Sequence, residues 1–392
     1  MKKNIVILGS TGSIGKQTLD IIRSNKDKFS VKLLSTNKNV NLIIKQAKIF
    51  KVKNIIIIDY KKFLIAKNKY KNLKINIFNS FDILDNKFNE KKIYYSMSAL
   101  VGIDGLEPTL KLIKLSKKIA IVNKESLVCG WPLIKKKLKI HKTEFIPIDS
   151  EHFSMNSLIK NYKKNDIKKI FITASGGPFL KNSKLNKKKI SVKDALKHPN
   201  WTMGKKISID SSTMMNKVLE VIEAKNIFDI NYNQIYILTH PMSYIHCLIE
   251  LNNGLIKLVA HEADMKIPIY NSIYENEKIL NLRKINLGIL NNLELKEIDK
   301  DQFPLVKILN HMPKYSSLYE TAIVTINDYF VELFITKKIS YNQLLKYIQF
   351  HLYSKEIIML KKIHVKNLKQ ILKIRQYIIL KLNKFVYKPI SW

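Results

Sequence analysis

A glycine-rich turn near the start of the chain sets the architecture: Ile5-Val-Ile-Leu8-Gly9-Ser-Thr-Gly12-Ser-Ile-Gly15. An apolar run typical of a strand leads into three glycines, and an amphipathic segment begins at Lys16. This is the context of a dinucleotide-binding loop, because glycines allow a tight turn and expose backbone N–H groups to a pyrophosphate at a helix N-terminus. The alternative is an ordinary glycine-rich turn between a strand and a helix.

Outward from this turn, short apolar runs alternate with amphipathic runs through the first 150 residues. The alternation predicts an α/β unit with a parallel, doubly wound sheet of the Rossmann type. Strands are expected at 4–8, 31–35, 54–58, 93–97, 119–122 and 144–148, and helices at 16–23 and 40–48.

The pattern changes twice after residue 150. Strand-like pieces at 169–173, 234–238 and 255–259, polar loops and a helix at 214–225 predict an α+β connecting domain. After about residue 300, Leu, Ile and Lys recur at helical spacing without glycine, which predicts a helical bundle. We therefore expect domains at 1–150, 151–280 and 301–392, with a linker at 281–300.

Composition excludes several classes of protein. The net charge is +38, but only three of the 69 basic residues are Arg, and Lys is spread along the chain with abundant Ile and Asn. These three amino acids share A/T-rich codons, so the charge indicates a codon bias rather than nucleic-acid binding, although it favours anionic substrates.

Membrane insertion and secretion are not expected. No stretch reaches the roughly 18 apolar residues of a spanning helix, and the apolar run at the start is too short for a signal peptide. Two cysteines, Cys129 and Cys247, cannot build a disulfide framework. A cytoplasmic location is therefore expected.

The end of the second strand indicates the cofactor. An NAD site usually offers a carboxylate there for the ribose hydroxyls. This strand instead ends at Asn37-Lys38-Asn39, where a Lys between amides suits a 2′-phosphate. NADPH is therefore preferred over NADH.

Two carboxylates follow the last strand of the first domain, in Asp149-Ser150-Glu151-His152. In extended backbone, residues two apart face the same side, so Asp149 and Glu151 are expected to converge. Two hard oxygen donors beside a nucleotide site suggest Mg²⁺ or Mn²⁺. The alternative is a polar loop with a capping Asp.

Two glycine-containing loops come next. Ser175-Gly176-Gly177 follows a strand and could present consecutive N–H groups to an anion, or form a simple turn. The segment 198–206 carries an exposed-looking aromatic residue, Trp201, and ends near Gly204. Lids that close on substrates have this composition, and so do inert loops.

The segment Asp210-Ser211-Ser212-Thr213 offers N-cap residues before a helix, so Ser211 is expected at a helix start, where it would add to an anion site. Asn216, Lys217 and Glu220 are spaced three and four apart and line one side of that helix. The alternative is a salt-bridged helix surface.

Together these segments resemble the 1-deoxy-D-xylulose 5-phosphate reductoisomerase family. They occur in the family's order and approximate spacing over residues 1 to about 270, and the tail resembles the family only in its helical character. The matching pieces are Gly9–Gly15, Asn123–Val128, Pro147–His152, Ser175–Phe179 and His198–Glu220.

The resemblance implies a role for each matching residue. Those implied to hold NADPH are Thr11, Gly12, Ser13, Ile14, Asn37, Lys38, Asn39, Asn123, Glu125 and Gly204. The implied metal ligands are Asp149, Glu151 and Glu220. The implied substrate and phosphate set is Lys124, Ser150, Ser175, His198, Ser211, Asn216 and Lys217, with Trp201 and Met203 in the lid.

The resemblance also implies the reaction. It is the NADPH- and metal-dependent rearrangement and reduction of 1-deoxy-D-xylulose 5-phosphate to 2-C-methyl-D-erythritol 4-phosphate in non-mevalonate isoprenoid biosynthesis. The protein is then a cytoplasmic homodimer whose substrate is a small phosphorylated sugar, with no nucleic-acid or membrane partner. Two alternatives stay open: another NADPH-linked dehydrogenase, and a decayed, non-enzymatic family member.

Three segments depart from the family's pattern. Phe153-Ser154-Met155 replaces a small or amide residue and Ala after His152. A family segment with Gly-Asp/Glu-Pro-Asp-Met-Arg reads His261-Glu-Ala-Asp-Met-Lys266, and Asn-Ala-Ala-Asn-Glu is reduced to Val324-Thr-Ile-Asn-Asp328. The departures concern dimer packing and catalytic activity, and they leave the nucleotide and metal assignments unchanged.

Overall fold

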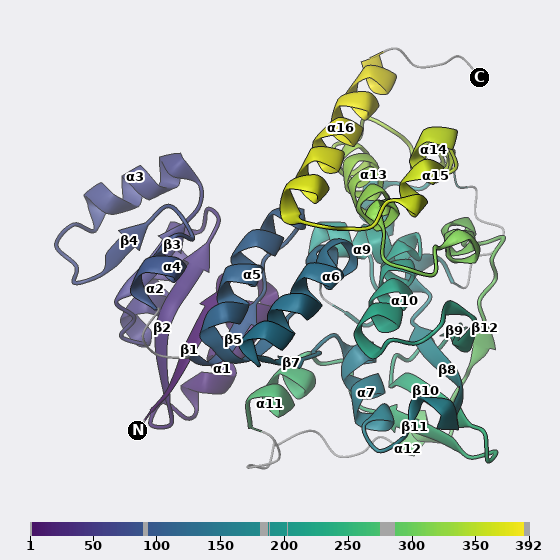
Figure 1. The fold of residues 1–392 in the computed structure, drawn as a ribbon, viewed down its shortest axis with the longest axis horizontal. Coiled ribbons are helices and arrows are strands. Elements are labelled where there is room, and N and C mark those ends of the chain that lie inside the picture. The colour runs from purple at the N-terminus through teal and green to yellow at the C-terminus, as the bar shows by residue number, and fades with distance from the viewer. Residues whose placement is uncertain are drawn as a thin grey trace. The chain divides into compact units, whose positions relative to one another are not determined.

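The fold is described from a computed structural model (Figure 1). The structure describes residues 2–88, 93–180, 187, 189–201, 203–274 and 287–387. The chain forms two compact units. The first comprises Met1–Leu127, Ile134–Phe153 and Met265–Leu282, and the second comprises Val128–Leu133, Ser154–Asp264 and Arg283–Trp392.

The first unit is built on a seven-stranded parallel sheet with the strand order β4-β3-β2-β1-β5-β6-β7. This confirms the doubly wound α/β prediction. The order reverses between β1 and β5, and in such sheets nucleotides bind outside the carboxyl ends of the strands at that point. The strands are β1 (Lys3–Leu8), β2 (Phe29–Thr36), β3 (Asn54–Ile57), β4 (Asn76–Phe78), β5 (Ile93–Ser98), β6 (Ser116–Ile121) and β7 (Glu144–Ile146).

Helices connect and cover these strands. Most of them connect one strand to the next, because parallel strands need a crossover connection between them. They are α1 (Ser13–Arg23), α2 (Val40–Ile49), α3 (Tyr60–Lys69), α4 (Ile83–Lys87), α5 (Leu106–Leu115) and α11 (Lys266–Tyr274), while α6 (Lys124–His141) and α7 (Ser150–Ile159) contribute residues to both units.

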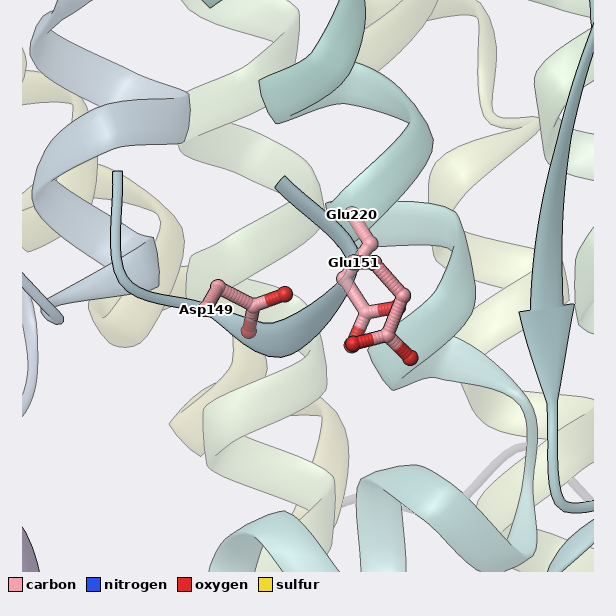
Figure 2. Close-up of side chains that lie close together, drawn as sticks. All are labelled: Asp149, Glu151 and Glu220. Carbon is pink, nitrogen blue, oxygen red and sulfur yellow. The ribbon is translucent and has the colours of Figure 1, made fainter. Parts of the chain in front are cut away.

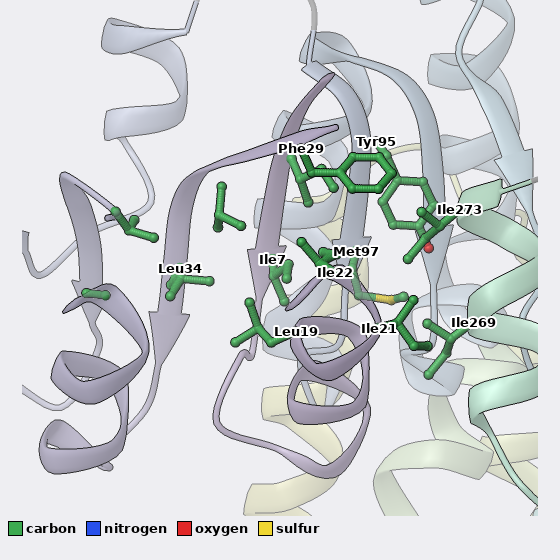
Figure 3. Close-up of a cluster of buried hydrophobic side chains, with 14 of the residues drawn as sticks. Ile7, Leu19, Ile21, Ile22, Phe29, Leu34, Tyr95, Met97, Ile269 and Ile273 are labelled. Atoms are coloured by element: carbon green, nitrogen blue, oxygen red, sulfur yellow. The ribbon is translucent and has the colours of Figure 1, made fainter. Parts of the chain in front are cut away.

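The core of the first unit includes a helix from far along the chain. Ile5 and Ile7 of β1 are fully buried, and α11 packs beside α1 with Ile269 and Ile273 in the same apolar cluster (Figure 3). The hydroxyl groups of Tyr95 on β5 and Ser272 on α11 are hydrogen bonded at 2.7 Å. No sequence pattern had predicted this return of the chain to the first unit.

The second unit is built on a five-stranded mixed sheet with the order β11-β10-β8-β9-β12, in which only β8 and β9 pair in parallel. The strand-like pieces that the sequence predicted correspond to β8, β9 and β11. The sequence analysis missed β10, which lies inside the sheet. The strands are β8 (Ile167–Ala174), β9 (Ile235–Thr239), β10 (Ile245–Leu251), β11 (Ile256–Ala260) and β12 (Lys296–Glu297).

Helices complete the second unit, and those after residue 300 form the expected helical region. The long helix α13 is buried over most of its length and contacts α14, α16 and α9. The helices are α8 (Val192–Ala195), α9 (Lys205–Ser212), α10 (Met215–Phe228), α12 (Leu287–Leu290), α13 (Leu318–Ile335), α14 (Tyr341–Leu352), α15 (Lys355–Met359) and α16 (Leu368–Tyr387). Among the described residues, no helix is both long and apolar enough to cross a bilayer.

Candidate active site

The glycine-rich turn joins β1 to α1, as predicted. Gly9 has φ +82°, and a Cβ added there would lie 2.2 Å from the carbonyl oxygen of Ala99. A Cβ on Gly15 would lie 2.4 Å from the carbonyl oxygen of Gly9. The fold therefore requires both glycines. A Cβ added at Gly12 would have no neighbour closer than 3.4 Å, and Gly12 precedes the first helical residue without a side-chain cap, so this helix start has room for an anion.

The residues that follow β2, Asn37, Lys38 and Asn39, are exposed and polar. Asn39 caps α2 by accepting a hydrogen bond from the backbone N–H of Leu42 at 3.2 Å. The Lys38 ammonium lies 3.8 Å from a carboxylate oxygen of Asp59, which follows β3. The sequence analysis had not placed Asp59 there. The ion pair is weak, because the Lys38 side chain is 68% exposed.

The start of α6 holds three candidates. Asn123 is buried and caps the helix: its side-chain oxygen accepts from the N–H of Ser126 at 2.7 Å, and its amide donates to the carbonyl of Gly102 at 2.9 Å. Glu125 is buried as well. The Lys124 ammonium lies 2.5 Å from a carboxylate oxygen of Asp149, so a cation and an acid are paired inside the first unit.

The Asp149–Glu151 pair lies close together, but for a different reason from the one predicted. The sequence analysis placed both residues on extended backbone, and this is wrong. Strand β7 ends at Ile146, α7 begins at Ser150, and the N–H of Phe153 donates to the carbonyl of Asp149 at 2.7 Å. Asp149 thus precedes the first helical turn and Glu151 lies within it (Figure 2). One carboxylate oxygen of each lies within 4.8 Å of the other.

Two neighbours complete the environment of this pair. The Ser150 hydroxyl donates to Glu151 at 2.5 Å, and the buried ring of His152 lies 3.4 Å from Asp149. Both carboxylates lie at the start of α7, and a helix N-terminus stabilises negative charge through the helix dipole.

The second unit places Asn216, Lys217 and Glu220 together on α10, as predicted. The amide of Asn216 donates to Glu220, and the Lys217 ammonium pairs with the same carboxylate. The Lys217 and Glu220 side chains are 4% and 2% exposed, so they do not form a solvated helix surface. An ion pair held inside a protein is costly to maintain, which marks this cluster as a candidate functional site.

The expected position of Ser211 at a helix start is wrong. Asp210, Ser211 and Ser212 form the last turn of α9, and the chain then breaks at Met214, which has φ +61°, before α10 begins. Two buried contacts fix this turn. The amide of Asn327 on α13 donates to Asp210 at 2.7 Å, and the Tyr341 hydroxyl donates to the carbonyl of Ser212 at 2.7 Å.

The contribution of Asn327 was missed by the sequence analysis. The sequence offered no clear signal for it, because the burial that forces this amide to find a hydrogen-bond partner is seen only in the structure.

Ser175 and His198 form a polar pair with defined proton positions. The Nδ1 atom of His198 accepts the backbone N–H groups of Asn200 at 3.2 Å and Trp201 at 2.9 Å. Burial lowers the pKa of His198 to about 4, so the ring is neutral at pH 7 and its proton is on Nε2. Nε2 lies 3.0 Å from the Ser175 hydroxyl oxygen and therefore donates to it.

The Ser-Gly-Gly segment acts as a turn rather than as a row of N–H groups. Gly176 has φ +85°, and the N–H of Gly177 donates back to the Ser175 hydroxyl at 3.2 Å. Ser175 thus accepts two hydrogen bonds, and its own hydroxyl hydrogen must be donated outward. The N–H of Gly177 therefore has a partner within the turn, which agrees with the simple turn that the sequence analysis gave as the alternative to a row of N–H groups.

The predicted lid segment begins at His198, and Gly204 ends it at the N-terminus of α9. Trp201 and Met203 are half-buried rather than exposed. The side chain of Asn200, which the sequence analysis did not select, donates to the carbonyl of Pro241 at 2.6 Å and to the Ser243 hydroxyl at 2.8 Å.

In sequence and in fold, the chain is similar to known reductoisomerases. The 1-deoxy-D-xylulose 5-phosphate reductoisomerase of Pelagibacter ubique is 56% identical over 344 residues, covering 87% of this chain and 89% of that protein. The enzyme of Clostridium tetani is 38% identical over 88% of this chain and 91% of its own. A crystal structure of DOX-P reductoisomerase in complex with NADPH, fosmidomycin and magnesium has a TM-score of 0.89 at 30% identity and covers 98% of both chains. The Zymomonas mobilis enzyme in complex with NADPH has a TM-score of 0.86 at 28% identity and covers all of both chains.

The parallel sheet, the glycine loop at its switch point and the paired carboxylates define a dinucleotide-dependent oxidoreductase with ligands for a hard cation. Three family models then cover most of the chain. They describe 1-deoxy-D-xylulose 5-phosphate reductoisomerase at residues 5–130, its C-terminal domain at 145–228, and the DXP reductoisomerase C-terminal domain at 261–378. The chain belongs to the 1-deoxy-D-xylulose 5-phosphate reductoisomerase family and is an NADP-dependent enzyme that isomerises and reduces this sugar phosphate.

Proposed function

We propose that the chain converts 1-deoxy-D-xylulose 5-phosphate to 2-C-methyl-D-erythritol 4-phosphate. The reaction uses NADPH and a divalent cation, Mg²⁺ or Mn²⁺, and is a step of non-mevalonate isoprenoid biosynthesis. The observation that carries the proposal is the buried Lys217–Glu220 ion pair with the half-buried Asn216 beside it, because a globular core alone does not require such a pair.

Asp149, Glu151 and Glu220 are proposed to hold the divalent cation. Carboxylate oxygens are the donors that Mg²⁺ and Mn²⁺ prefer. None of the three proposed ligands is a cysteine, the residue that would favour zinc. Asp149 and Glu220 each have a lysine partner, yet a carboxylate has two oxygens and can bind a lysine and a metal together. When bound, the cation supplies Lewis-acid stabilisation of negative charge on a substrate oxygen.

NADPH is proposed to bind at the carboxyl edge of the first sheet. The open helix start at Gly12, with Thr11, Ser13 and Ile14 around it, receives the pyrophosphate. Asn37, Lys38 and Asn39 receive the 2′-phosphate. The remaining contacts are assigned to Asn123, Glu125 and Gly204.

The substrate phosphate is proposed to lie against Ser175, His198, Ser211, Asn216 and Lys217. Ser175 supports this best, since its oxygen accepts from His198 and Gly177 and leaves its hydroxyl hydrogen for an anion. Lys217 supplies positive charge to the same anion. Binding the phosphate firmly orients the reacting end of the sugar, where Lys124 and Ser150 are assigned.

The segment 198–204 is proposed to close over the substrate, with Trp201 and Met203 facing it. Closure would exclude water from the reacting sugar. The first unit accordingly binds NADPH, while the second carries the phosphate site and the closing segment.

A homodimer is proposed from an apolar row on the second sheet. Tyr236, Phe171, Leu248 and Leu258 are cross-strand partners in register, so their side chains share one face. Tyr236 and Leu258 are 41% and 43% exposed, and Ile256 is 66% exposed. The ends of the row are exposed, while Phe171 and Leu248 between them are already partly or fully covered, and such a surface fits a second copy of the chain, which would bury it by two-fold symmetry.

A cytoplasmic location is proposed as well, because a reducing compartment keeps thiols free and both cysteines are buried free thiols.

Substitution of Glu220 by Gln tests the metal assignment. The variant should lose turnover severely and bind Mn²⁺ about tenfold or more weakly, measured by electron paramagnetic resonance of the free ion. NADPH binding, followed by its fluorescence, should remain unchanged because that cofactor is assigned to other residues. Glu223→Gln on the same helix is the matched control, since Glu223 is equally buried and has no role in the proposed site. Normal Mn²⁺ affinity and turnover in Glu220→Gln would refute the assignment.

A further inference from the structure

Three aromatic rings of the second unit connect the closing segment to the sheet. The Trp201 ring meets the His246 ring edge-on, with centroids 6.3 Å apart and an interplanar angle of 66°. His246 stacks on His261 with centroids 3.9 Å apart and an angle of 21°. His246 is 2% exposed, so the middle ring is enclosed.

A β-bulge places His246 in this stack. In the pairing of β10 with β11, Ile245 lies opposite Ala260 and Cys247 opposite Val259, so His246 is the extra residue. The three consecutive side chains at 245–247 are all buried, because β10 lies inside the sheet. Bulges re-aim side chains, and this one directs the ring of His246 toward His261.

The ring of His261 is held at both nitrogens. Nδ1 lies 2.7 Å from the carbonyl oxygen of Glu262 and must donate to it, because a carbonyl only accepts. Nε2 lies 3.5 Å from the hydroxyl of the fully buried Ser154. Burial lowers the pKa of His261, which favours the neutral ring. The Nε2 of His246 lies 3.3 Å from the carbonyl oxygen of His261, which fixes the second ring as well.

We propose that His261 is a positioning residue for the closing segment. Its ring supports His246 against Trp201, and this support sets the orientation in which the segment 198–204 meets the substrate. The proposal rests on the assignment of that segment to closure in the preceding subsection. It deepens that assignment by naming the part of the sheet that carries the lid.

His261→Ala and His261→Phe in the full-length enzyme test the proposal. His261→Ala should raise the KM for the sugar phosphate and weaken fosmidomycin binding by about three- to tenfold, as expected for the loss of one aromatic contact. The Kd for NADPH should not change. His261→Phe keeps a stacking ring but loses both ring-nitrogen contacts, so it should restore the KM to about the value of Ser154→Ala. Ser154→Ala, which removes only the contact to Nε2, should give a smaller increase.

A spectroscopic readout separates positioning from general destabilisation. With 5-fluorotryptophan incorporated, the ¹⁹F signal of Trp201, assigned by its loss in Trp201→Phe, should shift in His261→Ala and return in His261→Phe. An unchanged KM and signal in His261→Ala would overturn the proposal, and so would an equal loss of substrate and NADPH binding. Trp201→Ala is the reference: if it leaves the KM unchanged, the closure assignment itself fails, whereas an effect in Trp201→Ala without one in His261→Ala refutes only the role of His261.

Discussion

Glu320, at the start of α13, should make the stability of the second unit depend on pH. Its side chain is 1% exposed and accepts hydrogen bonds from the N–H of Ser317 at 3.0 Å and from the Ser317 hydroxyl at 2.7 Å. Burial raises the pKa of Glu320 to about 7, and the hydrogen bonds from Ser317 and the charge of Lys225 only partly offset this rise. A capping residue is therefore held in a place that disfavours its charged form.

The sign of the effect follows from proton linkage. Between its ordinary pKa of 4.5 and about 7, Glu320 is protonated in the folded chain but ionised in the unfolded chain. The folded state binds more protons in this window, so the free energy of unfolding falls as the pH rises through it. The interval of about 2.5 pH units, at roughly 1.4 kcal/mol per unit, gives a loss of about 3 kcal/mol by pH 8.

Replacing Glu320 by Gln should remove this loss, because the amide stays neutral and its oxygen can still accept from Ser317. We expect the variant to be more stable than the parent by about 3 kcal/mol at pH 8 and by less than about 1 kcal/mol at pH 5. Urea unfolding followed by tryptophan fluorescence measures it, since Trp131 and Trp201 both belong to the second unit.

The exposed Glu332 on the same helix provides the control, and Glu332→Gln should follow the parent at both pH values. Parallel stability curves for Glu320→Gln and the parent, or a less stable variant at pH 8, would refute the reasoning.

Three further predictions concern the cofactor, the lid and the dimer. Lys38→Ala should abolish a preference of about tenfold for NADPH over NADH in a binding titration, and an unaltered preference would contradict the 2′-phosphate assignment. Trp201→Ala should raise the KM for the sugar phosphate while leaving the Kd for NADPH nearly unchanged. Normal kinetics in this variant would show that the segment 198–204 is an inert loop. Leu258→Lys should shift the sedimentation equilibrium from dimer to monomer, whereas Leu380→Lys, on an exposed face of α16, should not; a persistent dimer in Leu258→Lys would exclude the β11 face as the interface.

Much of the first unit could be predicted because its signals are local. Each of the expected strands is a short apolar run next to an amphipathic helix, and parallel pairing forces a helix between neighbouring strands. The docking of α11 could not be predicted in this way. Its contacts with α1 and β5 join residues about 180 to 250 positions apart, as in the pair Tyr95–Ser272, and no local pattern records such a contact.

The strand β10 was missed for a related reason. Its residues are buried on both faces, so Ile245–Leu251 lacks the alternation that marks a half-exposed strand, and the bulge at His246 breaks the period further. The edge strand β11, with exposed apolar residues on a short polar-flanked run, was easier to recognise.

The candidate site shows why residue chemistry can be predicted when backbone geometry cannot. Asp149 and Glu151 were expected to converge on a strand, and they converge at the start of α7 instead, where Asp149 precedes the first helical residue and Glu151 lies in the first turn. Ser211 was expected to begin a helix and lies in the last turn of one, because Asn327 and Tyr341, more than 100 residues away, fix that turn. The types of ligand atom depend only on the residues present, whereas their directions depend on contacts made by distant segments. An assignment of metal and phosphate chemistry can therefore survive an error in local structure, but an argument about which group donates to the substrate, as at Ser175, requires the positions of His198 and Gly177.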